Sequence, residues 1–179
     1  MKQILFIATA LMLVLGTSCS PEKANAQTQE RPKDVVVETN PMATEGAEVL
    51  KAITAKYQGK VALIDFWATW CGPCMMAMKQ IDPLKEQYMK DKKDVVFVYV
   101  TGETSPLPNW KTAIPKIKGY HYRLSKVQFN NLLQHLGIRG IPSYMVINKD
   151  GTTAYDNIAE GGYPGDDVIK AEIDKALTK

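Results

Sequence analysis

The feature that most constrains the fold is a strand-to-helix transition at two closely spaced cysteines. Residues 61–67 form a nearly continuous apolar run, which is typical of a strand buried in a sheet. Apolar residues at helical spacing follow over residues 72–89, and Pro73 suits a first helical turn because its missing N–H is not needed there. Cys71 and Cys74 therefore lie where a strand ends and a helix begins.

This position gives the two cysteines a specific chemistry. Two cysteines separated by two residues can close a small disulfide ring and reopen it. At a helix start, backbone N–H groups without partners and the positive end of the helix dipole favour the thiolate of Cys71. Because the thiolate is the reactive form of cysteine, the motif predicts a dithiol that exchanges electrons with other dithiols.

Cysteine usage elsewhere supports this interpretation. Besides Cys19, the chain contains only Cys71 and Cys74, and their loop is too short to stabilise a fold appreciably. We predict no metal site, because there is no second cysteine pair and neither His121 nor His135 has ligand spacing to the first pair. No cofactor is expected.

Composition limits the size of the fold and the remaining classes of function. The 179 residues suffice for one modest domain, and an apolar content of 45% indicates a globular chain. The net charge of +3 is small and no basic stripe is present, so nucleic-acid binding is not expected.

The N-terminus has the pattern of an export signal. Residues 4–15 are continuously apolar, a length that suits a signal better than a membrane span. Directly after them, residues 16–19 resemble the lipobox of bacterial lipoproteins, in which Cys19 would be lipidated. An alternative cleavage site of the A-x-A type occupies residues 24–26. Both predict a protein of the bacterial envelope or periplasm, and the lipobox adds a lipid anchor in the membrane.

The rest of the chain divides into a tether and a domain. Residues 20–43 are polar and rich in proline, so we predict a flexible tether, with residues 35–37 as a possible first edge strand. Residues 44–179 alternate strands and helices, which predicts an α/β domain with a central mixed β-sheet flanked by helices on both faces. Strands are expected at residues 61–67, 95–100, 119–124, 143–148 and 152–158, and helices at 44–57, 72–89, 108–117, 125–136 and from 166 onward.

Two stretches resemble a known family. Residues 66–74, Phe-Trp-Ala-Thr-Trp-Cys-Gly-Pro-Cys, resemble the active-site stretch of the thioredoxin superfamily, and residues 137–143, Gly-Ile-Arg-Gly-Ile-Pro-Ser, resemble its cis-proline loop. The resemblance implies a thioredoxin-like fold over residues 44–179. The extra elements between residues 100 and 125, together with the export signal, are similar to the envelope-anchored branch typified by TlpA and ResA.

The resemblance implies three catalytic residues. Cys71 would attack the partner, and Cys74 would be the resolving thiol that breaks the mixed disulfide. Asp65 lies inside an apolar strand, where burial raises the pKa of a carboxyl group, and would take the proton of the resolving thiol. The alternative is an Asp65 at the strand end that faces water.

The resemblance also implies a peptide-binding surface. Pro142 is expected to be cis and to hold the backbone of Ile141 beside the nucleophile, where an extended peptide would bind. The expected substrate-binding residues are Trp70, Gly72, Pro73, Ile141 and Pro142.

These observations predict an exported thiol–disulfide oxidoreductase. By the same resemblance, the Gly-Pro dipeptide implies a reductase that acts on disulfide-containing envelope proteins, with a membrane electron donor that re-reduces the dithiol. Ala77 stands where the envelope branch often carries a glutamate, so the proton handling and cytochrome-maturation role of that branch are not carried over. The alternatives are an oxidase or isomerase, and a thioredoxin-fold chaperone or copper-binding module that uses the cysteines as soft ligands.

Overall fold

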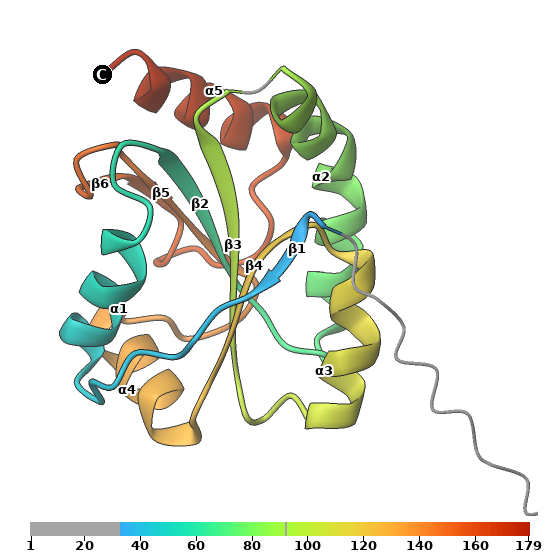
Figure 1. The fold of residues 1–179 in the computed structure, drawn as a ribbon, viewed down its shortest axis with the longest axis vertical. Helices are drawn as coiled ribbons and strands as arrows, with labels where there is room; N and C mark the ends of the chain where they lie inside the picture. The colour runs from blue at the N-terminus through green and yellow to red at the C-terminus, as the bar shows by residue number, and fades with distance from the viewer. Residues whose placement is uncertain (1–32, 92) are drawn as a thin grey trace, which may run out of the picture. The chain divides into compact units, whose positions relative to one another are not determined.

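A six-stranded mixed sheet organises the domain in the computed structural model, which describes residues 33–91 and 93–179 (Figure 1). Its strand order is β1-β4-β3-β2-β5-β6. The first four strands in this order pair in parallel, and β5 and β6 continue the sheet antiparallel. The strands are β1 (Val35–Val37), β2 (Val61–Phe66), β3 (Val95–Gly102), β4 (Gly119–Leu124), β5 (Ser143–Ile147) and β6 (Thr153–Asp156).

Helices cover both faces of this sheet. One face carries α1 and α4, and the other carries α2, α3 and α5 (Figure 1). The predicted thioredoxin-like α/β fold with a mixed sheet between two helical layers is therefore confirmed. The helices are α1 (Gly46–Ala55), α2 (Gly72–Lys90), α3 (Leu107–Ala113) with a 3-10 turn η1 (Ile114–Lys116), α4 (Lys126–Leu136) and α5 (Asp166–Leu177).

Each face of the sheet has its own hydrophobic core, and β2 contributes to both. Leu63 and Trp67 pack in the core that α2 and α5 cover, whereas Ile64 and Phe66 pack in the core that α1 and α4 cover. Successive side chains of a strand point to opposite faces, so a strand covered on both faces must be apolar throughout. This requirement explains the continuous apolar run that precedes the cysteines, and it makes Asp65 the exception.

The ends of α4 match their predicted signals. Ser125 Oγ accepts a hydrogen bond from the backbone N–H of Gln128 at 3.2 Å, and the Gln128 side chain accepts one from the N–H of Ser125 at 3.1 Å. This reciprocal capping satisfies two donors that the helix itself cannot. Gly137 ends the helix with a φ of 74°, a left-handed conformation that glycine adopts without strain.

The folded domain begins earlier than predicted. The signal at residues 1–19, Cys19 and the tether up to residue 32 lie outside the described residues. Residues 35–37, however, form β1 and pair in parallel with β4, as the possible edge strand anticipated. The Gln128 side chain then donates hydrogen bonds to the carbonyl oxygens of Pro41 and Ala43, at 2.6 and 2.8 Å. The predicted boundary between tether and domain at residue 44 is therefore wrong, because residues 35–43 are bound to the domain.

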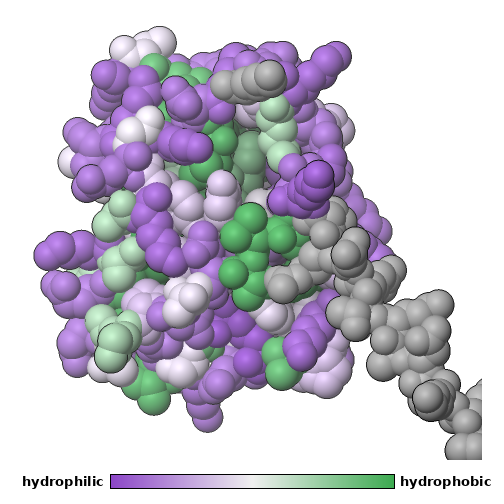
Figure 2. All heavy atoms as spheres, viewed as in Figure 1, coloured by the Kyte–Doolittle hydropathy of each residue, from purple (hydrophilic) through white to green (hydrophobic). Residues whose placement is uncertain are grey.

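The face of the domain seen in Figure 2 is mainly polar. Figure 2 shows hydrophilic side chains over most of the visible face, with apolar side chains in separate patches between them. Across residues 33–91 and 93–179, no helix is long and apolar enough to cross a membrane.

Candidate active site

Cys71 caps the N-terminus of α2 and forms a disulfide with Cys74. The Cys71 Sγ accepts a hydrogen bond from the backbone N–H of Cys74 at 3.2 Å, and no acidic residue occupies the first turn of α2. In the reduced state, this N–H and the positive end of the helix dipole would stabilise a thiolate at Cys71. Pro73 lies in the first turn, as its missing N–H allows.

The two sulfur-bearing residues differ in access to solvent. Cys71 is 4% exposed, whereas Cys74 is completely buried. Trp70, Gly72 and Pro73 are exposed around them, and Trp70 has 64% of its surface in contact with solvent. A sulfur of another protein can therefore approach Cys71 but not Cys74, which favours the predicted order of attack.

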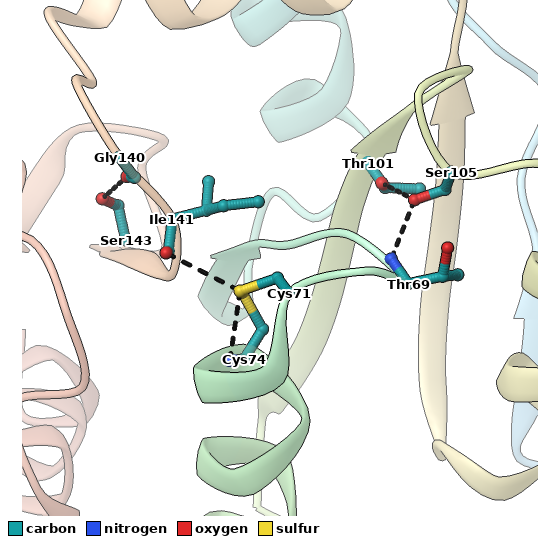
Figure 3. The surroundings of a disulfide bond; sticks show 8 residues. All are labelled: Thr69, Cys71, Cys74, Thr101, Ser105, Gly140, Ile141 and Ser143. Atoms are coloured by element: carbon teal, nitrogen blue, oxygen red, sulfur yellow. Dashed lines mark hydrogen bonds between the residues drawn. A yellow bond between two sulfur atoms is a disulfide. The ribbon is translucent and has the colours of Figure 1, made fainter.

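The predicted cis-proline loop lies beside this disulfide. The Ile141–Pro142 peptide bond is cis, as expected. The carbonyl oxygen of Ile141 lies 3.7 Å from Cys71 Sγ, so the fold brings together two segments that are 70 residues apart in sequence (Figure 3). In the disulfide this sulfur carries no proton to donate, so the pair is a close contact that becomes a possible hydrogen bond only after reduction. Ser143 Oγ donates to the carbonyl oxygen of Gly140 at 2.8 Å and closes the turn.

A serine that the sequence did not single out holds the loop before Cys71. Ser105 Oγ accepts a hydrogen bond from the backbone N–H of Thr69 at 3.0 Å and lies 2.8 Å from Thr101 Oγ1 (Figure 3). Arg123 Nε donates to the carbonyl oxygen of Ser105 at 2.9 Å, which ties the same turn to β4. No sequence pattern indicates this role, because the contact depends on how the turn after β3 folds back.

Asp65 is buried on the side of the sheet that α2 covers. It shares the alternation of Leu63 and Trp67, and its neighbours on the adjacent strands are Tyr99 of β3 and Tyr144 of β5. Only 3% of its surface is exposed, so the alternative of an Asp65 facing water is wrong. Among the described residues, its Oδ1 atom has no hydrogen-bond partner of normal geometry.

This environment changes the acidity of Asp65. Burial disfavours the charged carboxylate and raises the pKa of Asp65 from 3.8 to about 8. The positive charge of Lys85 and the nearby Tyr144 hydroxyl act in the opposite direction, and both lower the pKa. Since the Tyr144 hydroxyl, like Asp65 Oδ1, has no partner of normal hydrogen-bond geometry among the described residues, we assign it a weak effect. Near neutral pH, the group can both accept and release a proton.

Lys85 is a further buried ionisable residue that faces this core, and the expectations from the sequence did not include it. The side chain extends from α2 and is 1% exposed. Its Nζ donates to the Tyr99 hydroxyl at 3.2 Å and lies 2.7 Å from Asp82 Oδ1. A signal was present, since residue 85 continues the spacing of the inward-facing residues of the helix, Met78, Ile81 and Tyr88.

Among the described residues, neither histidine belongs to a group of side chains with the cysteines that could hold a metal ion. His121 is buried in β4, where its Nε2 lies 2.7 Å from the carbonyl oxygen of Ile117 and its ring stacks on Tyr99. His135 is exposed in the last turn of α4. In the part of the chain that the structure describes, no three His, Cys, Asp or Glu side chains are grouped so that they could hold a metal ion.

Two surface grooves flank the disulfide. One, of about 440 Å³, lies between α2 and the α3–η1 segment, with Thr69, Met75 and Asp82 in its lining. The other, of about 390 Å³, has Trp70 and Ile141 in its lining. Each groove is therefore lined in part by residues that lie close to Cys71 in sequence or in space.

Comparisons with known proteins agree with this arrangement. The family model described as thioredoxin-like matches residues 59–153. A thioredoxin from Coprinus comatus is 40% identical over 47 residues, which cover 26% of this chain and 42% of that protein. A protein described as thioredoxin 2 from Streptomyces coelicolor is 32% identical over 87 residues, which cover 49% of this chain and 44% of that protein. The matched segments span less than half the length of these curated relatives.

Solved structures extend the match. A protein from Bacteroides vulgatus described as a thiol-disulfide oxidoreductase is 30% identical, with a TM-score of 0.50 over 68% of this chain and 82% of that chain. Another protein of that species with the same description is 26% identical, with a TM-score of 0.54 over 70% of this chain and 78% of that chain. The chain therefore belongs to the thioredoxin-like family and carries its Cys71–Cys74 disulfide at the start of α2.

Proposed function

We propose that this chain is a thiol–disulfide oxidoreductase that reduces disulfides in proteins of the bacterial cell envelope. One observation carries the proposal: a cysteine pair caps a helix so that only its first member, Cys71, reaches the surface. A buried carboxylate, Asp65, faces the same core as the pair. This combination supplies a nucleophile, a resolving thiol and a group that can take up a proton.

The first step uses Cys71, the less buried of the two cysteines. The Cys71 thiolate attacks one sulfur of the partner's disulfide, so a Cys71–partner bond forms and the partner's own S–S bond breaks. The other partner sulfur leaves as a thiolate. The backbone N–H of Cys74 stabilises the attacking thiolate before the reaction, because it already points at Cys71 Sγ.

The second step uses the buried residues. Cys74 transfers its proton to Asp65 and attacks Cys71 Sγ, which forms the intramolecular disulfide and breaks the bond to the partner. The partner's second sulfur leaves as a thiolate, and both partner thiolates take up protons from water according to pH. The partner gains two electrons, and the chain reaches the oxidised state that the structure contains.

The surroundings of Cys71 suit a protein partner. The backbone of Ile141 is beside the sulfur, where an extended segment could pair with it, and the large exposed ring of Trp70 borders the same site. Met76 is 62% exposed on the first turns of α2, and Met75 lines the neighbouring groove. Methionine side chains adapt to different apolar partners, which fits a reductase that acts on several proteins.

Location and partners belong to the same proposal. An export signal at residues 1–19, a lipid on Cys19 and a tether before β1 would hold the domain near a membrane of the envelope. A membrane electron donor would re-reduce the Cys71–Cys74 disulfide after each turnover. This arrangement is similar to that of the TlpA and ResA branch, which the sequence resembles.

Insulin reduction tests the chemistry. Cys71→Ser should abolish the reduction, and Cys74→Ser should accumulate mixed disulfides on Cys71, which mass spectrometry of proteolytic fragments can locate. Turnover by Cys71→Ser, or adducts on other residues, would contradict the assigned order. The direction follows from the reduction potential: a value near about −270 mV supports a reductase, whereas one near about −120 mV indicates an oxidase.

A further inference from the structure

The buried amine of Lys85 has no role in the two steps described so far. Lysine is almost never fully buried unless it is paired, because an ammonium group loses its hydration inside a protein. Here the side chain passes from α2 into the core that also contains the cysteines, and only 1% of it remains exposed. Such a costly position suggests a purpose beyond packing.

The contacts of Lys85 connect the buried carboxylate with the surface. On the inner side, its Nζ donates to the Tyr99 hydroxyl at 3.2 Å and lies 5.5 Å from the centre of that ring. Tyr99 is the direct neighbour of Asp65 across β2 and β3. On the outer side, the same Nζ lies 2.7 Å from Asp82 Oδ1, whose side chain is half exposed and lines the groove between α2 and the α3–η1 segment.

Lys85 is the cationic member of the set of ionisable groups around Asp65. Tyrosines flank the carboxylate on both neighbouring strands, and a further tyrosine hydroxyl approaches from the segment before α5. The ionisable side chains around this part of the core are Cys74, Asp82, Lys85, Tyr99, His121, Tyr144 and Tyr163. Burial raises the pKa of both flanking tyrosines, so they stay neutral near pH 7 and leave Lys85 to balance the charge of Asp65.

We propose that Lys85 is a positioning residue of the redox reaction: its buried ammonium keeps Asp65 able to ionise, and Asp82 links that ammonium to solvent. The inference rests on the proposed role of Asp65 as the proton acceptor. Burial alone would hold Asp65 protonated, and a protonated carboxyl group cannot accept the proton of Cys74. The positive charge of Lys85 opposes burial and therefore increases the fraction of Asp65 that is ionised near neutral pH.

The electrostatic argument predicts opposite effects from the two ends of the ion pair. Without the ammonium, only the weaker effect of the Tyr144 hydroxyl offsets burial, so the pKa of Asp65 should rise. Without the negative charge of Asp82, the ammonium is less neutralised, so the pKa of Asp65 should fall. The second effect should be the smaller one, because Asp82 is half exposed and water screens its charge.

Carboxyl ¹³C NMR of the purified oxidised protein tests this directly. Lys85→Met should raise the titration midpoint of Asp65 by about one to three pH units, the size expected for a nearby opposite charge. Lys85→Arg should restore most of the wild-type midpoint, since it keeps the charge. Lys90→Met removes an exposed lysine from the same helix and should leave the midpoint unchanged.

Single-turnover kinetics provides the second measurement. In Lys85→Met, the pH at which the mixed disulfide resolves at half its maximal rate should rise with the Asp65 midpoint, while attack by Cys71 keeps its wild-type pH dependence. An unchanged Asp65 midpoint in Lys85→Met, or an equal change in Lys90→Met, overturns the proposal.

Two further outcomes are decisive on their own. If Lys85→Met does not fold, Asp82→Asn decides, and an Asp65 midpoint that stays constant or rises in that variant overturns the proposal. A wild-type chain that reduces no disulfides contradicts the proposed function instead, and the NMR titration still decides whether Lys85 controls Asp65.

Discussion

Replacing Asp65 with asparagine should remove a large dependence of stability on pH. In the folded state, burial keeps most of the carboxyl group protonated below about pH 8, where it is half ionised, whereas in the unfolded chain it ionises near its ordinary pKa of 3.8. The unfolded state therefore binds fewer protons between these values, and stability falls as pH rises. The contribution is fully present below about pH 4 and is lost by about pH 8. Asparagine cannot ionise, so the variant should lack this loss.

The size of the effect follows from the change in pKa. The change from 3.8 to about 8 is about four units, and each unit corresponds to about 1.4 kcal/mol at 25 °C. The full loss is thus on the order of 5 kcal/mol, of which about 4 kcal/mol falls between about pH 5 and pH 8. Because a domain of this kind is stable by only about 5–15 kcal/mol, the difference should be easy to measure.

Urea unfolding of the oxidised protein and of Asp65→Asn, followed across this pH range, measures the difference. The variant should gain stability over wild type as pH rises, and the gain should level off above about pH 8. Asp150→Asn is a matched control, because hydrogen bonds from Thr152 lower the pKa of Asp150, so its contribution is lost only as pH falls below about 4. Parallel stability profiles for wild type and Asp65→Asn between about pH 5 and pH 8 would refute the reasoning.

Three further predictions concern the kinetics of resolution, the packing of α1 and the membrane anchor. In single-turnover kinetics at pH 7, Asp65→Asn should slow the decay of the mixed disulfide by roughly 10²-fold, the size expected for a lost general base, and a wild-type rate would exclude that role. Gly46→Ala should destabilise the domain by about 1–3 kcal/mol in thermal or urea unfolding, because a Cβ atom there would lie 2.3 Å from the carbonyl oxygen of Asn131. Gly72→Ala has open space around the new Cβ and is the matched substitution, so equal losses would contradict the steric argument. Cys19→Ala should release the protein from membranes in cell fractionation, and unchanged partitioning would contradict the lipid anchor.

The central elements could be predicted from sequence because local signals and tertiary packing agree there. The apolar run of β2 is required by helices on both faces, and Ser125 and Gly137 mark the ends of α4 through backbone chemistry that depends on nearby residues alone. The position of the cysteines follows from the same local rules, since a strand end, Pro73 and a helical pattern define the N-terminus of α2.

The features that the sequence did not predict depend on contacts between different elements of the fold. Residues 35–43 look like a polar tether. They become part of the domain because residues 35–37 pair with β4 and because the Gln128 side chain donates hydrogen bonds to the backbone of Pro41 and Ala43. Lys85 looks like a surface lysine in a polar stretch, although its spacing places it inward. Its burial is possible because Asp82, one helical turn earlier, and the hydroxyl of Tyr99, on the adjacent strand β3, both contact its ammonium group.

The three-residue strand β1 has a practical consequence for handling the domain. It covers the outer edge of β4, a six-residue strand with two tyrosines and a histidine, and an uncovered edge of this kind invites strands of neighbouring molecules to pair with it. A fragment that starts at residue 44 would keep Cys71, Cys74 and the helices α1 to α5, yet it would expose that edge. Such a fragment should self-associate as its concentration rises, and one that starts at residue 33 should resist aggregation far better.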